Sequence, residues 1–175
     1  MPGAPCTTQE SEGGAPRFAV WAARDPGTDE HPGTPLERVQ IVKVWAQDGA
    51  SHERVFDVAG GTTGASVDLA TCTPQGAGAD SLCATWSDPE FDAAAPALYY
   101  ARVVENPSCR WTQWSCNARK VDCRAGAASG LEACCDPQVP KTIQERAWTS
   151  PIWWTPGTAG AVERGTSSDP RPPTQ

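Results

Sequence analysis

The stretch that decides the fold is ERVQIVKVWAQDGASHERVFDV, residues 37–58. Its first part, residues 37–46, is rich in β-branched residues and carries apolar side chains on both faces, which is typical of a central strand. The Asp48-Gly49 pair within residues 47–51 is a turn signal, and residues 53–58 form a second strand candidate. The stretch therefore predicts a β-hairpin whose first strand lies inside a sheet.

Further strand candidates follow from the same alternation of apolar residues between turn signals. They are residues 17–24 (RFAVWAAR), 65–70 (ASVDLA), 82–86 (LCATW), 97–105 (ALYYARVVE) and 142–155 (TIQERAWTSPIWWT), the last as one or two strands with Pro151 at an edge or bulge. Helical periodicity never extends beyond a few residues. Short strands separated by turns predict a mainly β protein, namely an antiparallel β-sandwich with long, disulfide-braced loops.

Composition divides the chain into three regions. Residues 1–16 are polar and rich in Pro and Gly, as in a linker, and residues 17–156 hold the sandwich-like domain with a Cys-rich loop at 106–141. Residues 157–175 lack apolar anchors and are expected to form a disordered tail. Leu, Ile, Val and Phe together supply only 23 of the 175 residues, and the net charge is −7. We therefore expect a small core that depends on tryptophans and disulfides.

Eight cysteines indicate an oxidising compartment, periplasmic or extracellular, in which they form disulfides. Cys72 and Cys83 flank a short Gly/Pro-rich loop, and we predict that they pair. The other six are Cys6, Cys109, Cys116, Cys123, Cys134 and Cys135. Cys6 is expected to tie the N-terminal segment to the loop of residues 106–141. The adjacent Cys134 and Cys135 are expected to reach different partners because a vicinal bridge is strained. The remaining connectivity stays open, as does a redox role for the adjacent pair.

An exported protein needs a signal peptide, and the start of this sequence does not look like one. Residues 1–11 have neither a basic start nor an apolar run. The natural protein is therefore expected to begin upstream of Met1. The sequence contains no membrane-spanning stretch. Its acidic balance and the lack of a Lys/Arg cluster argue against nucleic acid as a partner.

No catalytic or metal-binding residue is predicted in the chain. The two histidines, His31 and His52, lie in turns and are expected to be exposed, and no Cys-x-x-Cys pair accompanies them. The acidic residues of SDPEFD, residues 87–92, read as a turn with solvated charges rather than as paired catalytic carboxylates. No glycine loop has the context of a phosphate site.

Five residues are candidates for binding or for a domain interface: Trp111, Trp114, Glu145, Arg146 and Trp154. Trp111 and Trp114 in CRWTQWSC either form a sugar-stacking platform or pack against disulfides, and the poverty in Leu and Ile favours packing. Glu145 and Arg146 suggest a salt bridge at an interface. Trp153 and Trp154 point to opposite faces of a strand, so one is expected in the core and the other toward a neighbouring domain.

Four separated segments carry a resemblance to a known family. They are residues 37–59, SDPEF at 87–91, ALYYARVVENPSCRWTQWSCNA at 97–118 and PKTIQERAWTSPIWWTP at 140–156. In this order they resemble the C-terminal end of large bacterial proteins known as domain of unknown function 3604, with the resemblance running from about residue 18 to residue 156. The loop cysteines resemble those of a cysteine-bearing subset of the family.

The resemblance implies a longer protein. Family members resemble PHP (polymerase and histidinol phosphatase) metal-dependent hydrolases, with an N-terminal domain that opens on a His-x-His metal motif and a β-sandwich-like C-terminal region. This chain has no His-x-His motif, so no metal ligand is carried over. A divalent metal is expected in the N-terminal domain, and no cofactor is expected in this chain.

Three hypotheses follow for its function. The first is a non-catalytic C-terminal accessory or structural domain of a larger exported PHP-like hydrolase, whose partner is its own N-terminal catalytic domain. In that role the loop of residues 106–141 is expected to reach over the catalytic domain as a flap. The second is a secreted module that binds carbohydrate with Trp111 and Trp114. The third is a structural secreted domain with no ligand.

Overall fold

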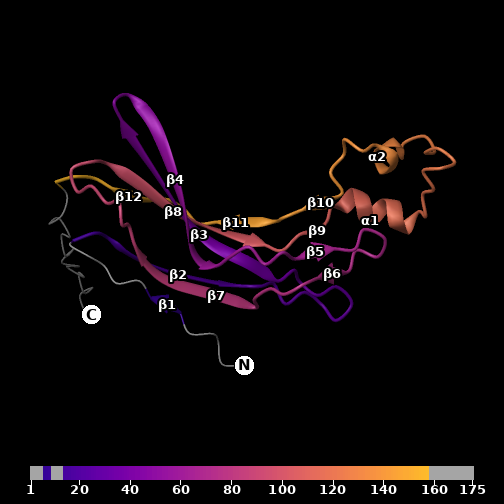
Figure 1. The fold of residues 1–175 in the computed structure, drawn as a ribbon, viewed down its shortest axis with the longest axis horizontal. Coiled ribbons are helices and arrows are strands. Elements are labelled where there is room, and N and C mark those ends of the chain that lie inside the picture. The colour runs from indigo at the N-terminus through magenta and orange to yellow at the C-terminus, as the bar shows by residue number, and fades with distance from the viewer. Residues whose placement is uncertain (1–5, 9–13, 158–175) are drawn as a thin grey trace, which may run out of the picture.

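A computed structural model describes residues 6–8 and 14–157. The predicted tail, residues 157–175, lies outside the described residues apart from Gly157, and so does most of the predicted linker, residues 1–16. Two antiparallel-rich sheets pack face to face, and a small helical lobe projects from one end of them (Figure 1).

The larger sheet is built around the stretch that decides the fold. Its strands are β3 (Leu36–Gln47), β4 (Ala50–Gly60), β8 (Ala97–Glu105), β11 (Arg146–Trp148) and β12 (Ile152–Trp154). β3 lies between β4 and β8, and β11 and β12 both pair with the far edge of β8. The predicted central strand is thus confirmed. Pro151 separates β11 from β12, where its missing N–H interrupts no ladder.

The hairpin turn between β3 and β4 is also as predicted. Gln47 pairs with Ala50, which leaves only Asp48 and Gly49 in the turn. Both have positive φ, 53° and 76°. This is the backbone that a two-residue turn of type I′ requires, and it explains the Asp-Gly pair at this point.

The smaller sheet has β7 (Ser81–Ser87) in the middle. β2 (Arg17–Ala23) pairs with it antiparallel, and β1 (Thr7–Thr8) pairs with it parallel on the other side. The strands predicted at residues 17–24 and 82–86 are therefore confirmed. The segment predicted as a linker contributes β1 to this sheet.

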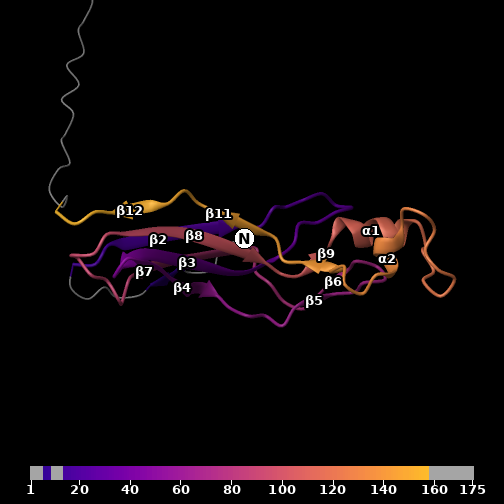
Figure 2. The same cartoon turned by 90° about the horizontal axis from the view of Figure 1, so that it is seen from above.

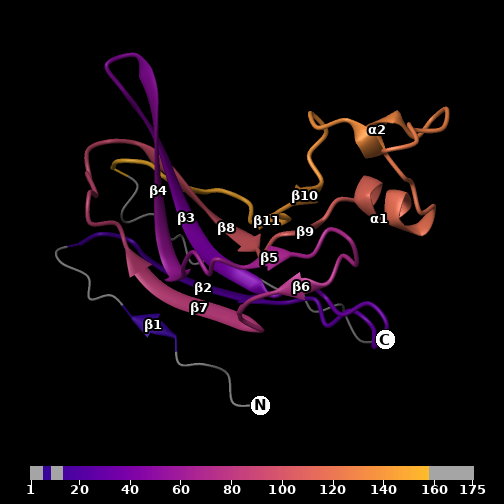
Figure 3. The same cartoon turned by 45° about the vertical axis from the view of Figure 1, so that its right-hand side comes forward.

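The core lies between the two sheets (Figure 3). Its buried residues are Ala22, Leu36, Val39, Ile41, Val58, Ala59, Ala84, Trp86, Ala97 and Tyr99. Aromatic rings join the layers: Phe18 lies 4.8 Å from Tyr99, and Phe56 lies 4.8 Å from Trp86, between ring centroids. Large aromatic side chains thus supply buried area that the few Leu and Ile residues cannot.

The strand predicted at residues 65–70 is much shorter. It is reduced to β5 (Ser66–Val67), which pairs with β6 (Pro74–Gln75). The cause is Asp68, whose carboxylate accepts the Ala70 amide at 2.7 Å and whose carbonyl accepts the Cys72 amide at 2.6 Å. An aspartate that bonds to the backbone after it replaces a strand with a turn.

The Cys-rich loop of residues 106–141 contains secondary structure that the sequence did not predict. β9 (Ser108–Cys109) and β10 (Thr142–Ile143) pair at its base, and α1 (Trp111–Ala118) and α2 (Glu132–Cys135) form the lobe. In Figures 1 and 2 the lobe extends beyond the end of the sandwich. The inward face of α1 carries Gln113, Cys116 and Asn117 rather than aliphatic residues. Apolar periodicity is therefore absent from the helix, which is why the pattern did not predict it.

All eight cysteines form disulfides, as predicted. The bonds are Cys6–Cys83, Cys72–Cys109, Cys116–Cys134 and Cys123–Cys135. The adjacent Cys134 and Cys135 have different partners, as predicted. The predicted Cys72–Cys83 bond is wrong, and so is the expectation that Cys6 reaches the loop of residues 106–141.

The reason lies in the directions of the two cysteine side chains. Cys83 lies opposite Trp21 on the outward face of the smaller sheet, beside the strand that follows Cys6. Cys72 lies at the turn after β5, where its Sγ accepts a hydrogen bond from Asn117 of α1 at 3.4 Å. A short loop in sequence does not bring its ends together when β6 carries the chain away between them.

Candidate functional site

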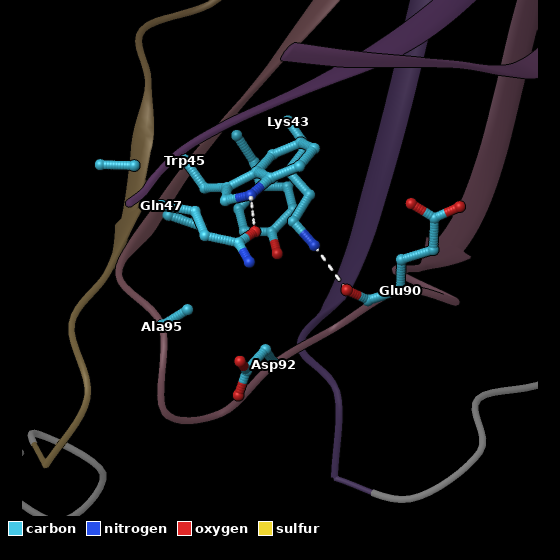
Figure 4. A pocket seen from close by; sticks show the side chains of 9 residues that line it. Lys43, Trp45, Gln47, Glu90, Asp92 and Ala95 are labelled. Atoms are coloured by element: carbon cyan, nitrogen blue, oxygen red, sulfur yellow. Dashed lines mark hydrogen bonds between the residues drawn. The ribbon is translucent and has the colours of Figure 1, made fainter. Parts of the chain in front are cut away.

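A polar cavity of about 290 Å³ opens at the end of the sandwich opposite the helical lobe. Its walls come from β3, from the start of β8 and from the connection between β7 and β8 (Figure 4). The lining residues are Lys43, Trp45, Ala46, Gln47, Glu90, Asp92, Ala95, Ala97 and Tyr99.

A buried ion pair forms the floor of this cavity. The Lys43 ammonium lies 2.5 Å from Asp88 Oδ2, and their side chains are 7% and 0% exposed. The Tyr99 hydroxyl donates to the same oxygen at 2.8 Å, and Lys43 also donates to the Glu90 carbonyl at 2.6 Å. The Glu90 amide donates to Asp88 Oδ1 at 2.9 Å. The pair therefore fixes residues 88–90 onto the larger sheet.

This arrangement corrects the interpretation of SDPEFD as a turn with solvated charges. Glu90 and Asp92 are exposed, but Asp88 is buried. A carboxylate is buried at acceptable cost only when charge and hydrogen bonds compensate it, and Lys43 and Tyr99 do so here. The roles of Lys43 and Tyr99 were not predicted from the sequence. The available signal was the charged Lys43 on the inward face of β3, between Ile41 and Trp45.

Tyr99 should ionise far above the ordinary range for a phenol. Its burial, its hydrogen bond to Asp88 and the Asp88 charge, in this order, raise its pKa. A raised folded-state pKa means that the stabilising effect of the neutral phenol is complete below about pH 10 and is lost at higher pH. In an alkaline titration, the difference in phenolate absorbance between the wild type and Tyr99→Phe reports the ionisation of Tyr99. We expect this difference to appear only as the chain unfolds. A reversible transition near the ordinary phenol pKa in the folded state would contradict this.

The mouth of the cavity carries polar side chains on an aromatic wall. Trp45 stacks on His52, with ring centroids 5.3 Å apart, and its Nε1–H lies 3.4 Å from Gln47 Oε1. Asp92 Oδ1 accepts the Ala94 amide at 2.8 Å, which orients that carboxylate. In Figure 4 the Gln47 amide and the Asp92 carboxylate face the cavity from two sides. The Glu90 carboxylate points away from it and bonds to Arg54 at 3.1 Å.

Trp111 and Trp114 are exposed on one face of α1, 73% and 47% respectively. Their spacing of three residues places them side by side on the helix surface. The opposite face is held by Gln113 and Asn117, which both donate to the Leu69 carbonyl. The interpretation that favoured packing of these two tryptophans against disulfides is therefore wrong.

The outer face of the larger sheet is apolar along its middle. Cross-strand pairing places Val44 beside Leu98 and Leu98 beside Trp153 on this face. We define the outer apolar face as Val44, Val55, Leu98, Tyr100, Trp148 and Trp153, which surround the buried Val42. Trp148 and Trp153 are 61% and 69% exposed. Trp153 also lines a groove of about 260 Å³ whose other walls are almost entirely apolar.

The strand register decides between the two adjacent tryptophans of β12. Trp154 pairs with Ala97 on the inward face, packs against the core and contacts Phe91 edge to face at 4.9 Å. Trp153 takes the exposed position. The residue predicted for an interface, Trp154, thus lies on the core side of the strand.

Glu145 and Arg146 lie near one edge of the sandwich, beside Glu105 and Trp21 in a cavity of about 320 Å³. Both are exposed, and the ion pairs of the described residues do not include one between them. Glu145 instead accepts the Glu105 amide with its carbonyl at 3.0 Å. Burial, and then the nearby Glu145 and Asp25 carboxylates, raise the pKa of Glu105.

Glu105→Gln should stabilise the protein at neutral pH. A carboxyl with a raised folded-state pKa gives its full stabilisation below the unfolded pKa of about 4.3 and loses it as the pH rises through the folded value. Removing the charge should therefore help most at neutral pH, and the gain should fade in acid. Urea midpoints at several pH values measure this, with Glu53→Gln on exposed β4 as the control. A gain that grows toward low pH would contradict the assignment.

The remaining candidates behave as surface residues. His31 and His52 are exposed, as predicted. Within the described residues no group of three or more His, Cys, Asp or Glu side chains is arranged to hold a metal ion. None of the helices in the described part of the chain is long and apolar enough to cross a membrane.

Comparison with known proteins identifies the family of the chain. Neither a curated protein sequence nor a solved structure matches the chain. A family model described as "Protein of unknown function (DUF3604)" matches residues 3–156, which include both sheets and the helical lobe. The chain therefore belongs to the DUF3604 family.

Proposed function

We propose that this chain is a non-catalytic accessory domain of a larger, exported protein with a PHP-like metal-dependent hydrolase domain. Its outer apolar face would dock against another domain of the same polypeptide. The observation that carries the proposal is that face, and above all the exposure of Trp148 and Trp153 on it. A divalent metal would belong to the hydrolase domain.

The outer apolar face is better suited to contact with another protein domain than to exposure to water. Single exposed apolar residues are common, but a contiguous apolar surface on one sheet face marks an interaction site. Val44, Leu98 and Trp153 are direct cross-strand neighbours, so their surfaces are continuous. Domain interfaces within one chain bury roughly 600–1,500 Å² and remain partly polar. The neighbouring row of Asp57, Gln40 and Arg102, joined by hydrogen bonds of 2.6 and 2.8 Å, supplies a polar border, and Trp148 lies at the end of this row beside Arg102.

The four disulfides support the exported location. Disulfides persist in oxidising compartments such as the bacterial periplasm and the cell exterior. Two of them lie in the helical lobe, where they close chain separations of 18 and 12 residues. The lobe projects from the sandwich, which is the position that a braced flap over a neighbouring domain would need (Figure 1).

Hydroxyl-radical footprinting tests the docking. The gene is sequenced upstream of Met1, and the longer polypeptide that it encodes is compared with the 175-residue chain. We expect Trp148 and Trp153 to be oxidised several-fold more slowly in the longer protein. Trp21, which is 70% exposed on the smaller sheet, is the internal control and should react equally in both. Equal oxidation of Trp148 and Trp153 in the two proteins would refute docking at this face.

A second candidate function is carbohydrate binding by Trp111 and Trp114. The observation in its favour is their exposure as a pair on one face of α1, at the projecting end of the molecule. Aromatic faces stack on sugar rings as they stack on other flat apolar surfaces. A tryptophan fluorescence titration with a panel of glycans is the test, with Trp114→Ala as the variant and Trp21→Ala as the matched control. A response that survives Trp114→Ala would exclude this platform.

A further inference from the structure

We propose that the cavity at the end of the sandwich binds a single neutral sugar ring, with Gln47 and Asp92 as its polar contacts and Trp45 as its wall. This site lies at the other end of the molecule from the helical lobe, so it is independent of Trp111 and Trp114 (Figure 1). Its polar contacts, Gln47 and Asp92, do not belong to the outer apolar face, although Trp45, Ala46 and Ala97 also line the groove beside Trp153.

The cavity is preformed, which is the first requirement of a small-molecule site. The floor is held by the Lys43–Asp88 pair and by the Tyr99 hydroxyl. Residues 88–90 are bonded to that pair, and the turn that follows is closed by Asp92. The volume of about 290 Å³ lies just below the range of roughly 300–1,000 Å³ for small-molecule pockets. It therefore suits one ring better than an extended oligosaccharide.

Hydrogen-bonding groups that face the cavity have unused capacity. Gln47 uses its Oε1 to accept from Trp45, and no described residue accepts from its Nε2. Asp92 uses Oδ1 for the Ala94 amide, and among the described residues nothing donates to its Oδ2. The Lys43 ammonium is already directed to Asp88 and to the Glu90 carbonyl. The cavity thus presents a donor from Gln47 and an acceptor from Asp92.

This combination selects a ligand that both donates and accepts and that also has an apolar face. A hydroxyl group can donate to the Asp92 carboxylate while it accepts from the Gln47 amide, as vicinal sugar hydroxyls do. The C–H groups of a pyranose ring can contact the part of the Trp45 indole that lines the cavity, and the indole is held there by stacking on His52 and by the Lys43 ammonium 5.3 Å from its ring centroid. Ala95 and Ala97 leave space beside it.

Charge decides against an anionic ligand. Asp92 faces the cavity without a cationic partner among the described residues, while Lys43 is paired with Asp88 and Glu90 with Arg54. The chain as a whole carries a net charge of −7. A phosphate or a uronate would meet a negative potential at the entrance, so a neutral sugar is the better fit.

The test is a two-dimensional NMR titration of the ¹⁵N-labelled 175-residue chain with neutral monosaccharides and with glucuronate. Glucose, galactose, mannose, xylose and N-acetylglucosamine form the neutral panel. We expect at least one of them to shift the indole N–H signal of Trp45 with a Kd in the millimolar range, as few contacts allow. Glucuronate should bind more weakly than the neutral sugar of the same stereochemistry.

Variants assign the binding to this cavity. Gln47→Ala and Asp92→Ser should each weaken binding by about tenfold, because each removes a contact with the sugar. The shorter serine side chain still offers an oxygen that can cap the turn, so the loop should keep its shape. Glu90→Gln is the matched control and should leave the Kd unchanged, because that carboxylate points away. The proposal is overturned by a panel that leaves Trp45 unshifted, by binding that survives both variants, or by a preference for glucuronate.

Discussion

Lys43→Met should destabilise the protein by about 3–5 kcal/mol, the cost of leaving one partner of a buried ion pair unpaired. Asp88 has no exposed side-chain surface, so water cannot replace the lost ammonium. The Tyr99 hydroxyl and the Glu90 amide would remain as donors, but neither carries a charge. The Glu90 carbonyl would also lose the Lys43 donor. Urea unfolding with the disulfides intact measures the loss in the free energy of unfolding.

Two further variants separate this effect from a general intolerance of β3 to change. Arg54→Met removes the exposed ion pair between Arg54 and Glu90, and it should cost less than about 1 kcal/mol. Lys43→Met combined with Asp88→Leu should be more stable than Lys43→Met alone, because no unpaired charge then remains buried. The loss in the free energy of unfolding for the double variant is compared with the sum of the losses for Lys43→Met and Asp88→Leu alone. If the two were equal, the side chains would not be coupled, and the buried pair would be refuted as a stabilising unit.

The strands that could be predicted are those whose side chains alternate between the two faces of a sheet. β3, β4 and β8 combine β-branched residues with apolar side chains on both faces, and their bounds agree with the prediction to within a few residues. The Asp48-Gly49 turn was equally readable, because few residue pairs tolerate two consecutive positive φ angles. These features are local, and local patterns suffice for them.

The features that were missed depend on partners far apart in the chain. Asp88 looks solvated within its own segment, and only Lys43 and Tyr99, on two other strands, make its burial acceptable. The Cys72–Cys109 bond depends on where the β5–β6 turn meets the base of the lobe. The polar inward face of α1 is explained by the Leu69 carbonyl that it covers. Apart from the charged Lys43 between the inward-facing Ile41 and Trp45, these contacts have no signature in the sequence that immediately surrounds either partner.

The candidate sites also differ in whether they depend on a local pattern or on residues far apart in the chain. The exposed pair on α1 was visible in CRWTQWSC, although its orientation was not. The cavity beside Trp45 joins β3 to residues that come much later in the chain, so only the fold could bring Gln47 and Asp92 together. The outer apolar face required the register, because the side of the sheet to which Trp153 belongs is fixed by its pairing with Leu98.

Removal of the two lobe disulfides should unfold the lobe and leave the sandwich intact. Cys116 is the one buried residue of α1, and none of the α2 residues is buried, so the lobe has no apolar core of its own. An isolated helix of eight residues is too short to persist in water. The bonds Cys116–Cys134 and Cys123–Cys135 close chain separations of 18 and 12 residues, and each is worth about 3 kcal/mol in the chain-entropy model.

Hydrogen exchange of the variant in which these four cysteines are replaced by alanine measures the effect. The amides of Trp114 and Arg119, which bond within the α1 segment, should exchange at least about a hundredfold faster than in the wild type, as a loss of about 3 kcal/mol implies. Amides of β3 and β8 should be unchanged, because the core between the sheets contains neither of these bonds. Cys6→Ala combined with Cys83→Ala is the matched control, since it removes a disulfide at the smaller sheet and should leave the lobe protected. If the α1 amides stayed protected without the two disulfides, the hydrogen bonds to Leu69 and the Cys72–Cys109 bond alone would hold the lobe. The idea of a rigid, disulfide-braced platform for Trp111 and Trp114 would then have to be abandoned.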